Sequence, residues 1–293
     1  MSIKVLAVVG STASGKSELA IKLARRFGGE IISADSRQVY RGLDIGSGKV
    51  MKAEQKLVPH HLLDVANPRK TFSVARYQVS AERALIQITK RGHLPIICGG
   101  SGQYVDAALG RLILPPVPPN SHWRRVLEKL STEELFTRLQ ILDPRRAILI
   151  DRYNRRRLIR AIEVVKALGS VPELNREEKY SVLLLGIKLA KDKLRQRIKI
   201  RLRRRWRKGL VEEVRNLHAT GLSWHRLDEL GLEYRWAAHY LQGQLTEKEV
   251  LKKLETEIWH YAKRQLTWFK RDLKINWITN RHQAEKLCRD FID

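Results

Sequence analysis

The fold is decided by the stretch IKVLAVVGSTASGKSELAIKLARRF, which occupies residues 3–27. It opens with a continuous apolar run at residues 5–9, typical of a strand buried on both faces. From residue 17 to residue 27 the pattern is amphipathic and predicts a helix. The turn between them satisfies G-x-x-x-x-G-K-[ST] and consists of Gly10, Ser11, Thr12, Ala13, Ser14, Gly15, Lys16 and Ser17. Strand, glycine-rich turn and helix in this order predict a phosphate-binding loop.

The chemistry of such a loop follows from its residue types. Backbone N–H groups turn inward around phosphate oxygens, and the start of the helix adds partial positive charge. We expect Lys16 to reach the terminal phosphate and the Ser17 hydroxyl to bind Mg²⁺. The loop does not identify the rest of the ligand. A nucleotide such as ATP is its commonest partner, but a pyrophosphate ester on another skeleton would bind equally well.

Further strands and helices alternate along the chain. Apolar runs at residues 30–34 and 94–98 predict strands, and residues 73–91 predict a helix. Shorter apolar runs at residues 181–189 and 273–278 predict two more strands. We therefore predict an α/β fold: a P-loop NTPase-like parallel sheet with helices on both faces, and a small all-helical insertion domain. The predicted core comprises residues 1–113 and 180–293, and the insertion comprises residues 114–179, which begin near the proline-rich linker.

Polar side chains follow two of the predicted strands. Asp35 comes directly after the second strand, and Ser101 follows the strand at residues 94–98 in a glycine-rich turn. Ligands in parallel sheets bind beyond the carboxyl ends of the strands, beside the phosphate loop. Asp35 fits either a general base or a second-shell Mg²⁺ ligand, and a plain turn cap remains the structural alternative. Free N–H groups near Ser101 could help to hold a departing diphosphate.

The charge balance indicates a polyanionic partner. The chain carries 57 Lys and Arg against 31 Asp and Glu, a formal net charge of +26. Nine cationic residues and no acidic residue lie between Arg195 and Lys208, and apolar residues recur there every four positions. This pattern predicts an amphipathic helix with one packed face and one face for phosphates. The double histidine at residues 60–61 has no partner at metal-ligand spacing, and we interpret it as structural.

Several protein classes are disfavoured by composition. No stretch approaches the ~20 apolar residues that a membrane-spanning helix needs. The two cysteines, Cys98 and Cys288, lie far apart and indicate a reducing compartment. We expect a cytoplasmic monomer with no membrane association.

The motifs together resemble one family, the tRNA dimethylallyltransferases, also called tRNA isopentenyltransferases. The most specific blocks are DSRQVYRG at residues 35–42 and AKRQLTWF at residues 262–269. PHHLLD at residues 59–64, GGSGQY at 99–104, RRLIRAIEV at 156–164 and GLVEEV at 209–214 also match. The absence of a zinc-finger motif after the last block favours the bacterial type.

This resemblance implies an activity and a set of site residues. The reaction would transfer a dimethylallyl group from dimethylallyl diphosphate to N6 of adenosine 37, in tRNAs that read codons beginning with U. The adenine would be flipped out of the anticodon stem-loop into a channel that the diphosphate enters from the other side. Asp35 would be the general base, Ser101 would be catalytic, and Arg197 or Arg201 would neutralise the leaving diphosphate. The tRNA would meet Asp35, Ser36, Arg37, Gln38, Ser101, Arg124, Arg156, Arg157, Leu158, Ile159 and Arg160.

Departures from the family pattern and competing interpretations remain open at this point. Ser101 stands where the family usually has threonine, and residues 231–235 replace a commoner Gly-Tyr-[KR] pattern. A P-loop kinase of a small metabolite would explain Lys16 and Asp35 but not the charge. A nucleic-acid-dependent ATPase would need a longer core. A non-catalytic RNA-binding module would leave the phosphate loop unexplained.

Overall fold

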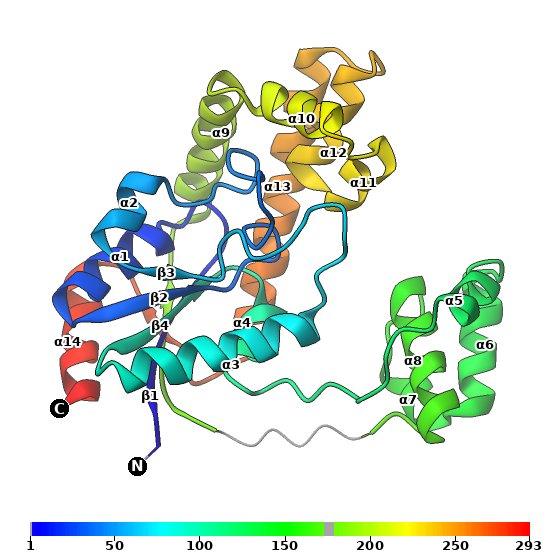
Figure 1. The fold of residues 1–293 in the computed structure, drawn as a ribbon, viewed down its shortest axis with the longest axis horizontal. Helices are drawn as coiled ribbons and strands as arrows, with labels where there is room; N and C mark the ends of the chain where they lie inside the picture. The colour runs from blue at the N-terminus through cyan, green and yellow to red at the C-terminus, as the bar shows by residue number, and fades with distance from the viewer. Residues whose placement is uncertain (1, 173–178) are drawn as a thin grey trace. The chain divides into compact units, whose positions relative to one another are not determined.

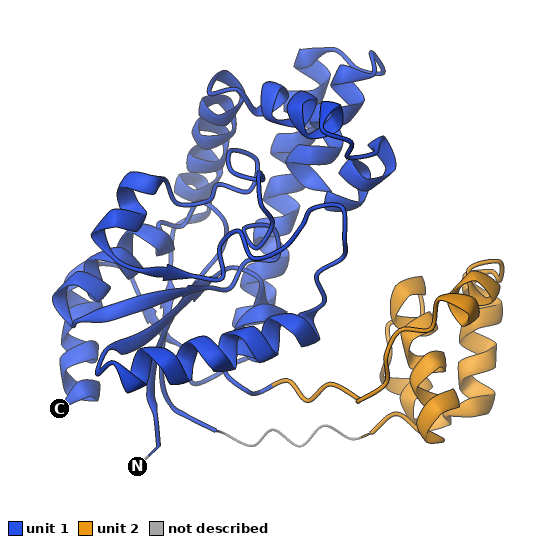
Figure 2. Ribbon diagram, viewed as in Figure 1, with its two compact units in different colours: residues 1–111, 177–293 blue, residues 112–176 orange. Residues whose placement is uncertain are grey.

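The chain folds into two compact units (Figures 1 and 2). The computed structural model describes residues 2–172 and 179–293. Unit 1 comprises residues 1–111 and 177–293, and unit 2 comprises residues 112–176. The sequence prediction had placed these limits at residues 113 and 180, and the second limit adjoins residues 173–178, which lie outside the described residues.

Unit 1 is built on one six-stranded sheet, and every neighbouring pair of its strands is parallel. The strand order is β3-β2-β4-β1-β5-β6. The strands are β1 (Lys4–Val9), β2 (Gly29–Ser33), β3 (His60–His61), β4 (Leu94–Gly99), β5 (Ser181–Ile187) and β6 (Asn276–Ile278). The predicted parallel α/β core is therefore confirmed. The short strand β3 was not predicted as a strand, and it consists of the histidine pair that we interpreted as structural.

The central strands β1 and β4 place the site at their carboxyl ends. Their register pairs Val8 with Cys98 and Val9 with Gly99, so the phosphate loop and the glycine-rich turn leave the sheet side by side. Because these strands are buried on both faces, their side chains form near-continuous apolar runs instead of alternating with polar ones.

Helices cover both faces of the sheet (Figure 1). One face packs on α1 (Lys16–Arg26) and on α14 (Arg281–Ile292), which share a core with β1, β4 and β5. The opposite face is covered by α3 (Val74–Lys90) and α4 (Gly102–Ala108). The Tyr77 hydroxyl of α3 donates to the carbonyl oxygen of Ser33 at 3.0 Å, next to the site edge. A short helix, α2 (Lys52–Leu57), lies between β2 and β3.

Five consecutive helices of unit 1 form a bundle above the carboxyl edge of the sheet. They are α9 (Lys191–Arg207), α10 (Leu210–Ala219), α11 (Trp224–Leu230), α12 (Leu232–Leu241) and α13 (Glu247–Phe269). Leu194, Ile198 and Leu202 of α9 pack on the apolar face of α13, as their four-residue spacing predicted. The basic face of α9 is thereby left outside this small core.

Unit 2 is all-helical, as predicted, with its own hydrophobic core. Its helices are α5 (Ser121–Leu127), α6 (Thr132–Leu142), α7 (Pro144–Leu149) and α8 (Arg155–Leu168). Leu158 is fully buried in this core and Ile159 is only 7% exposed. Both side chains lie on the apolar face of α8 and pack into this core, and their predicted contact with tRNA stays a prediction.

Candidate active site

The phosphate loop has the backbone conformation that its glycines permit. Gly15, the N-cap of α1, has a φ of 99°, a left-handed conformation that disfavours any residue with a Cβ. Lys16 is the first residue of α1, and its Nζ lies 3.3 Å from the carbonyl oxygen of Ser11, folded over the loop. The amino end of α1 is thus presented beside a lysine, as a phosphate site requires.

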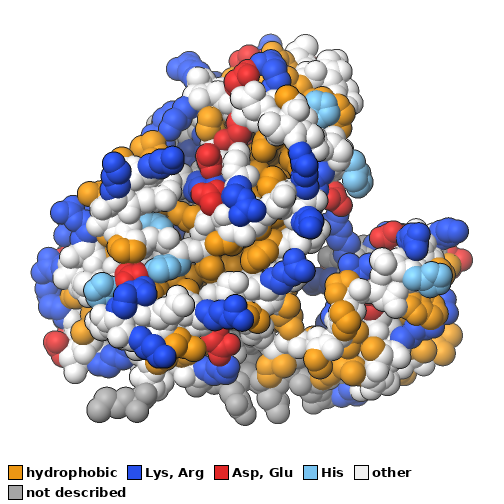
Figure 3. Space-filling view, in the orientation of Figure 1, with side chains coloured by type: hydrophobic (Ala, Val, Ile, Leu, Met, Phe, Trp, Pro, Cys, Tyr) orange, Lys and Arg blue, Asp and Glu red, His pale blue; other side chains and the backbone are white. Residues whose placement is uncertain are grey.

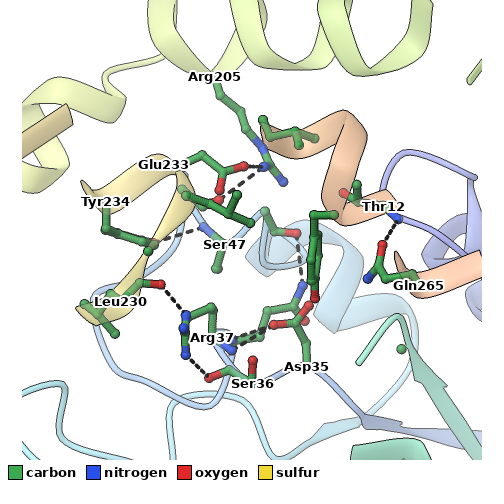
Figure 4. Close-up of a pocket in the computed structure, with 18 of the residues that line it drawn as sticks. Thr12, Asp35, Ser36, Arg37, Ser47, Arg205, Leu230, Glu233, Tyr234 and Gln265 are labelled. Carbon is green, nitrogen blue, oxygen red and sulfur yellow. Dashed lines mark hydrogen bonds and ion pairs between the residues drawn. The ribbon is translucent and has the colours of Figure 1, made fainter. Parts of the chain in front are cut away.

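A cavity of about 340 Å³ opens beside this loop at the carboxyl edge of the sheet (Figure 4). It brings together segments more than 200 residues apart in the sequence. The side chains that bear on its chemistry are Lys16, Ser17, Asp35, Ser36, Arg37, Gln38, Arg201, Arg205, Glu233, Glu257, Tyr261 and Arg264. Lys16 and Asp35, predicted from separate motifs, therefore line the same space.

The two carboxylate oxygens of Asp35 have different surroundings. Its Oδ1 accepts from the backbone N–H groups of Arg37 at 2.8 Å and of Gln38 at 3.3 Å. This is the turn-capping arrangement that we kept as an alternative. Among the described residues Oδ2 has no hydrogen-bond partner, and Figure 4 shows the carboxylate turned toward the residues that line the cavity. The carboxylate is therefore fixed through one oxygen, and the other is available to a ligand.

The side chains next to Asp35 are held in place by neighbouring backbone. Arg37 Nε donates to the carbonyl oxygen of Leu230 at 2.6 Å, which ties it to the end of α11. Gln38 accepts from the Ser33 hydroxyl at 3.0 Å and donates to the carbonyl oxygen of Gly48 at 3.2 Å. Gln38 therefore supports the wall of the cavity through bonds within the protein.

The two candidate arginines of α9 occupy different positions. Arg201 lines the cavity with Lys16 and Asp35. Burial, followed by the nearby Arg205 guanidinium, lowers the pKa of Arg201 to about 9. Arg197 is exposed; its Nη1 donates to the carbonyl oxygen of Ser14 at 3.1 Å and braces the phosphate loop from outside. Of the two, Arg201 is the one that faces the cavity.

Cationic charge in the cavity exceeds what the protein itself neutralises. Burial lowers the pKa of Lys16, and Arg201 lowers it further. Neither cation forms an ion pair with a carboxylate in the described part of the chain. Arg205, by contrast, is paired with Glu233 at 2.9 Å. A site with half-buried, unpaired cations attracts an anionic ligand, because such a ligand would raise the pKa values of both groups back toward their ordinary range.

Ser101 lies behind the cavity wall. It is not among the described residues that line the cavity. Its Oγ accepts from the backbone N–H of Ser36 at 3.4 Å and also bonds with the Tyr261 hydroxyl. Both of those partners line the cavity, so Ser101 contacts lining residues, and its predicted catalytic role stays a prediction. These bonds use the hydroxyl of Ser101, a group that threonine also has.

Gln265 of α13 is a site residue that the motif analysis left without a role. Its Oε1 accepts from the backbone N–H of Thr12 at 2.7 Å, and its Nε2 donates to the carbonyl oxygen of Gly100 at 2.8 Å. One amide thereby joins the phosphate loop to the turn after β4, and Figure 4 shows its bond to Thr12. The sequence held a signal: position 265 falls on the apolar face of α13, between Ala262 and Phe269.

A second cavity of about 600 Å³ adjoins the first. The two share Lys16, Ser17, Gly48, Arg201 and Arg205 in their linings. The rest of its lining comes from residues 44–54, from the phosphate loop with the start of α1, and from the basic face of α9, including Arg197, Arg204 and Lys208. The cationic cluster around Lys16 can therefore be approached from two directions.

The predicted basic residues of unit 2 divide into paired and exposed groups. Arg124 Nε and Nη2 each lie 2.9 Å from the carboxylate of Glu163, which also accepts from Arg160 at 3.4 Å. Arg156 and Arg157 are exposed at the start of α8. Lys and Arg side chains cover much of the molecular face drawn in Figure 3, with far fewer carboxylates among them. The exposed arginines fit a polyanionic partner better than the paired ones do.

The remaining findings concern the membrane and the thiols. No helix in the described ranges is long and apolar enough to cross a bilayer. Cys98 and Cys288 are both buried free thiols.

Comparisons with known proteins agree with one another. A family model described as IPP transferase matches residues 38–272. tRNA dimethylallyltransferase 1 of Geotalea uraniireducens is 44% identical over 271 residues, covering 92% of this chain and 89% of the relative. The tRNA dimethylallyltransferase of Anoxybacillus flavithermus is 40% identical over 283 residues, covering 94% and 90%. A solved tRNA isopentenylpyrophosphate transferase from Bacillus halodurans is 34% identical with a TM-score of 0.72, covering 99% and 94%. A eukaryotic dimethylallyltransferase is 23% identical with a TM-score of 0.83, covering 99% and 77%, and shares the fold.

Proposed function

Because the chain belongs to the IPP transferase family, we propose that it transfers a dimethylallyl group from dimethylallyl diphosphate to N6 of adenosine 37 in tRNA. The tRNAs would be those that read codons beginning with U, and the products would be N6-isopentenyladenosine and diphosphate. The relatives named above are tRNA dimethylallyltransferases, and they match this chain over nearly its whole length. A cytoplasmic location is proposed with this function, because the proposed substrate is tRNA, and a monomer is proposed as the oligomeric state.

One observation carries the proposal: Lys16 and Asp35 line the same cavity, and a second cavity meets it at the cationic cluster. A prenyl transfer between a diphosphate and a nucleobase needs two ligands that approach one point from different sides. A kinase site would need the phosphate loop and an acid, but it would not use the basic face of α9. The arrangement therefore supports transfer to a large polyanion over phosphorylation of a small molecule.

The diphosphate would be held by the chain's own cations and hydroxyl. The loop N–H groups and Lys16 would bind phosphate oxygens, and Arg201 would take the charge that grows on the leaving diphosphate. Ser17 supplies an oxygen ligand at the same cavity, and Mg²⁺ in phosphate sites is commonly completed by substrate oxygens and water. This hydroxyl beside the phosphate loop fits Mg²⁺, which when bound would neutralise diphosphate charge.

Asp35 would remove the proton that the reaction releases. The N6 amine of adenine is a weak nucleophile; its nitrogen forms a bond to C1 of the dimethylallyl group as the C1–O bond to the diphosphate breaks. The proton from N6 passes to Asp35, whose Oδ1 is fixed by backbone N–H groups while Oδ2 is available. Ser36, Arg37 and Tyr261 form the adjoining wall and would orient the base.

Extraction of the base from its stack must be offset by contacts elsewhere on the tRNA. Flipping a base costs a few kcal/mol, and phosphate contacts can supply that free energy. We propose that the exposed Arg156 and Arg157 of unit 2 bind the anticodon stem-loop, together with the basic face of α9. Arg124 and Arg160 share the Glu163 carboxylate, and Arg160 also bonds to the carbonyl oxygen of Val117. They would contribute to tRNA binding indirectly, by stabilising the backbone conformation of unit 2.

The decisive experiment offers the purified protein dimethylallyl diphosphate, Mg²⁺ and a tRNA carrying A36-A37-A38, and measures prenylated adenosine. We expect transfer, and we expect Asp35→Asn to lower kcat by about 10²–10⁴-fold, the usual contribution of a general base. The tRNA affinity of this variant should stay within about threefold, because Asp35 is one of many contacts.

The same experiment has outcomes that contradict the proposal. Consumption of ATP without prenyl transfer would favour a kinase or a motor. Equal losses of turnover and of tRNA affinity in Asp35→Asn would assign Asp35 to binding.

A further inference from the structure

A short loop of residues 44–48 separates the two cavities. Gly46, Ser47 and Gly48 line the first cavity, and Asp44, Ile45 and Gly48 line the second. The loop backbone packs directly on the cationic cluster. A Cβ added at Gly48 would lie 1.4 Å from Arg205 Nη2 and 3.0 Å from Arg201 Nη2. The position of this loop therefore fixes the space that the two guanidinium groups can occupy.

One carboxylate outside both cavities holds the loop. Glu213 of α10 accepts from three consecutive backbone N–H groups: Asp44 at 3.0 Å, Ile45 at 2.6 Å and Gly46 at 3.0 Å. Successive N–H groups that converge in this way form an anion-binding nest. Glu213 fills that nest with an anion from the protein itself, because both of its oxygens face donors.

Two further contacts complete the attachment of the loop. The buried Tyr234 hydroxyl donates to Glu213 Oε1 at 3.0 Å and accepts from the backbone N–H of Ser47 at 3.0 Å. Arg205 Nη1 donates to the carbonyl oxygen of Gly46 at 3.1 Å (Figure 4 shows Arg205 and Tyr234 on opposite sides of Ser47). Burial raises the pKa of Tyr234, and the neighbouring Glu213 charge raises it further, so the hydroxyl remains a donor.

From these contacts we propose that Glu213 is a positioning residue for the diphosphate site, acting through the loop of residues 44–48 and Tyr234. The proposal rests on the proposed function, since it assigns the site behind the loop to a diphosphate. Glu213→Gln removes the charge and replaces one of the two acceptor oxygens by an NH2 donor, so part of the nest loses its acceptor beside a cationic cluster. The loop then relaxes and no longer holds the guanidinium groups of Arg201 and Arg205 in place.

The test compares Glu213→Gln with Glu212→Gln. Glu212 is the adjacent carboxylate on the same helix; it is exposed and pairs only with Arg215 among the described residues. We expect Glu213→Gln to raise the KM for dimethylallyl diphosphate about tenfold, the effect of losing hydrogen bonds to a charged group. Its kcat at saturation and its tRNA affinity should stay within about threefold. Glu212→Gln should match the wild type in all three.

Two readouts do not depend on prenyl transfer. Calorimetric binding of Mg²⁺–pyrophosphate should weaken about tenfold in Glu213→Gln, in step with KM. Hydrogen exchange of the Asp44, Ile45 and Gly46 amides should accelerate, because these donors share a carboxylate that becomes an amide with one acceptor oxygen. If the wild type transferred no prenyl group but these two shifts were seen, the proposed function would fail and the loop assignment would stand.

A double-mutant cycle excludes a general loss of stability. Tyr234→Phe removes the hydroxyl that links Glu213 to Ser47 and should raise the same KM by a smaller factor. The double variant Glu213→Gln/Tyr234→Phe should be no worse than Glu213→Gln, because both act through one loop. Multiplicative effects, or a KM for Glu213→Gln equal to that of Glu212→Gln, would overturn the proposal.

Discussion

Strand β2 (Gly29–Ser33) has a charged cluster at each end, and the two clusters are built in opposite ways. At its start the buried Glu30 has three cationic or potentially cationic partners: His61 at 2.6 Å, Arg91 at 2.7 Å and His93 at 2.5 Å. Beyond its end, Asp35 faces a cavity in which Lys16 and Arg201 have no ion-paired carboxylate in the described ranges. One cluster is complete within the protein, and the other lacks an anion.

The difference separates charge that stabilises from charge that binds. Burying an ion is costly, and partners within the protein offset that cost at Glu30. At the other end of the strand no carboxylate pairs with Lys16 or Arg201 to offset the free-energy cost of burying their charges. Burial therefore lowers the pKa values of both groups. A ligand anion can recover this free energy on binding. Incomplete neutralisation at the carboxyl edge of the sheet is therefore the physical mark of the active site.

The largest effect is expected from a substitution in the cluster that faces the cavity. Lys16→Met keeps the apolar length of the side chain and removes its charge. We expect kcat/KM for dimethylallyl diphosphate to fall about 10²–10³-fold, as for loss of one charge-stabilising donor. The free energy of unfolding should not decrease, because a cation without an ion-paired partner contributes no ion-pair stability. Steady-state kinetics and urea unfolding measure the two quantities; a clear loss of stability would show that Lys16 is a structural cation.

Local patterns in the sequence identified one cluster in outline and missed the other. The phosphate loop and Asp35 follow buried strands directly, so the positions of Lys16 and Asp35 at one edge could be predicted from their neighbours in sequence. Glu30 was read only as the start of an apolar strand. Its partners, His61, Arg91 and His93, come from strand β3 and from the turn between α3 and β4, and only the parallel pairing of the strands brings them together.

The same limit applies to residues that act across long sequence separations. Glu213 lies 168 positions from Ile45 and Gln265 lies 253 positions from Thr12. Both nevertheless fall on apolar helix faces, Glu213 in phase with Leu210 and Val214 of α10. A polar residue in phase with a buried stripe is a signal that sequence can give. The residue that it binds cannot be predicted from the sequence in this way, because that contact depends on the tertiary fold.

The second prediction breaks the complete cluster. Glu30→Gln leaves His61, Arg91 and His93 without their shared anion, and we expect about 3 kcal/mol lower free energy of unfolding, as for a broken buried ion pair. Prenyl transfer at saturating substrates should stay within about twofold of wild type, because Glu30 lies at the opposite end of β2 from Asp35. Urea unfolding and initial rates test both parts. A loss of activity without a loss of stability would reverse the assignment of the two ends.

Acid titration provides the control for Glu30→Gln. Burial alone would raise the pKa of Glu30, but hydrogen bonds from Arg91, His61 and His93 outweigh it and lower the pKa from 4.5 to about 2. A carboxyl whose pKa is lower in the folded state contributes stability that is fully present above pH 4.5. This contribution is lost as the pH falls from 4.5 toward 2. The stability difference between wild type and Glu30→Gln should therefore be constant at neutral pH and shrink across that acid range.

The smallest effect is expected when Glu30 loses only one of its three partners. His93→Ala removes one of three partners of Glu30, but the His93 side chain is 48% exposed, so water can replace its bond. We expect a loss of about 1 kcal/mol, the net value of a typical hydrogen bond. His61→Ala should cost more, because His61 is only 25% exposed. In a Glu30→Gln background both costs should fall toward zero, since the anion that couples them is gone. Persistence of the full cost there would mean that the histidines stabilise β3 and the end of α3 by packing alone, and that Glu30 is not the centre of the cluster.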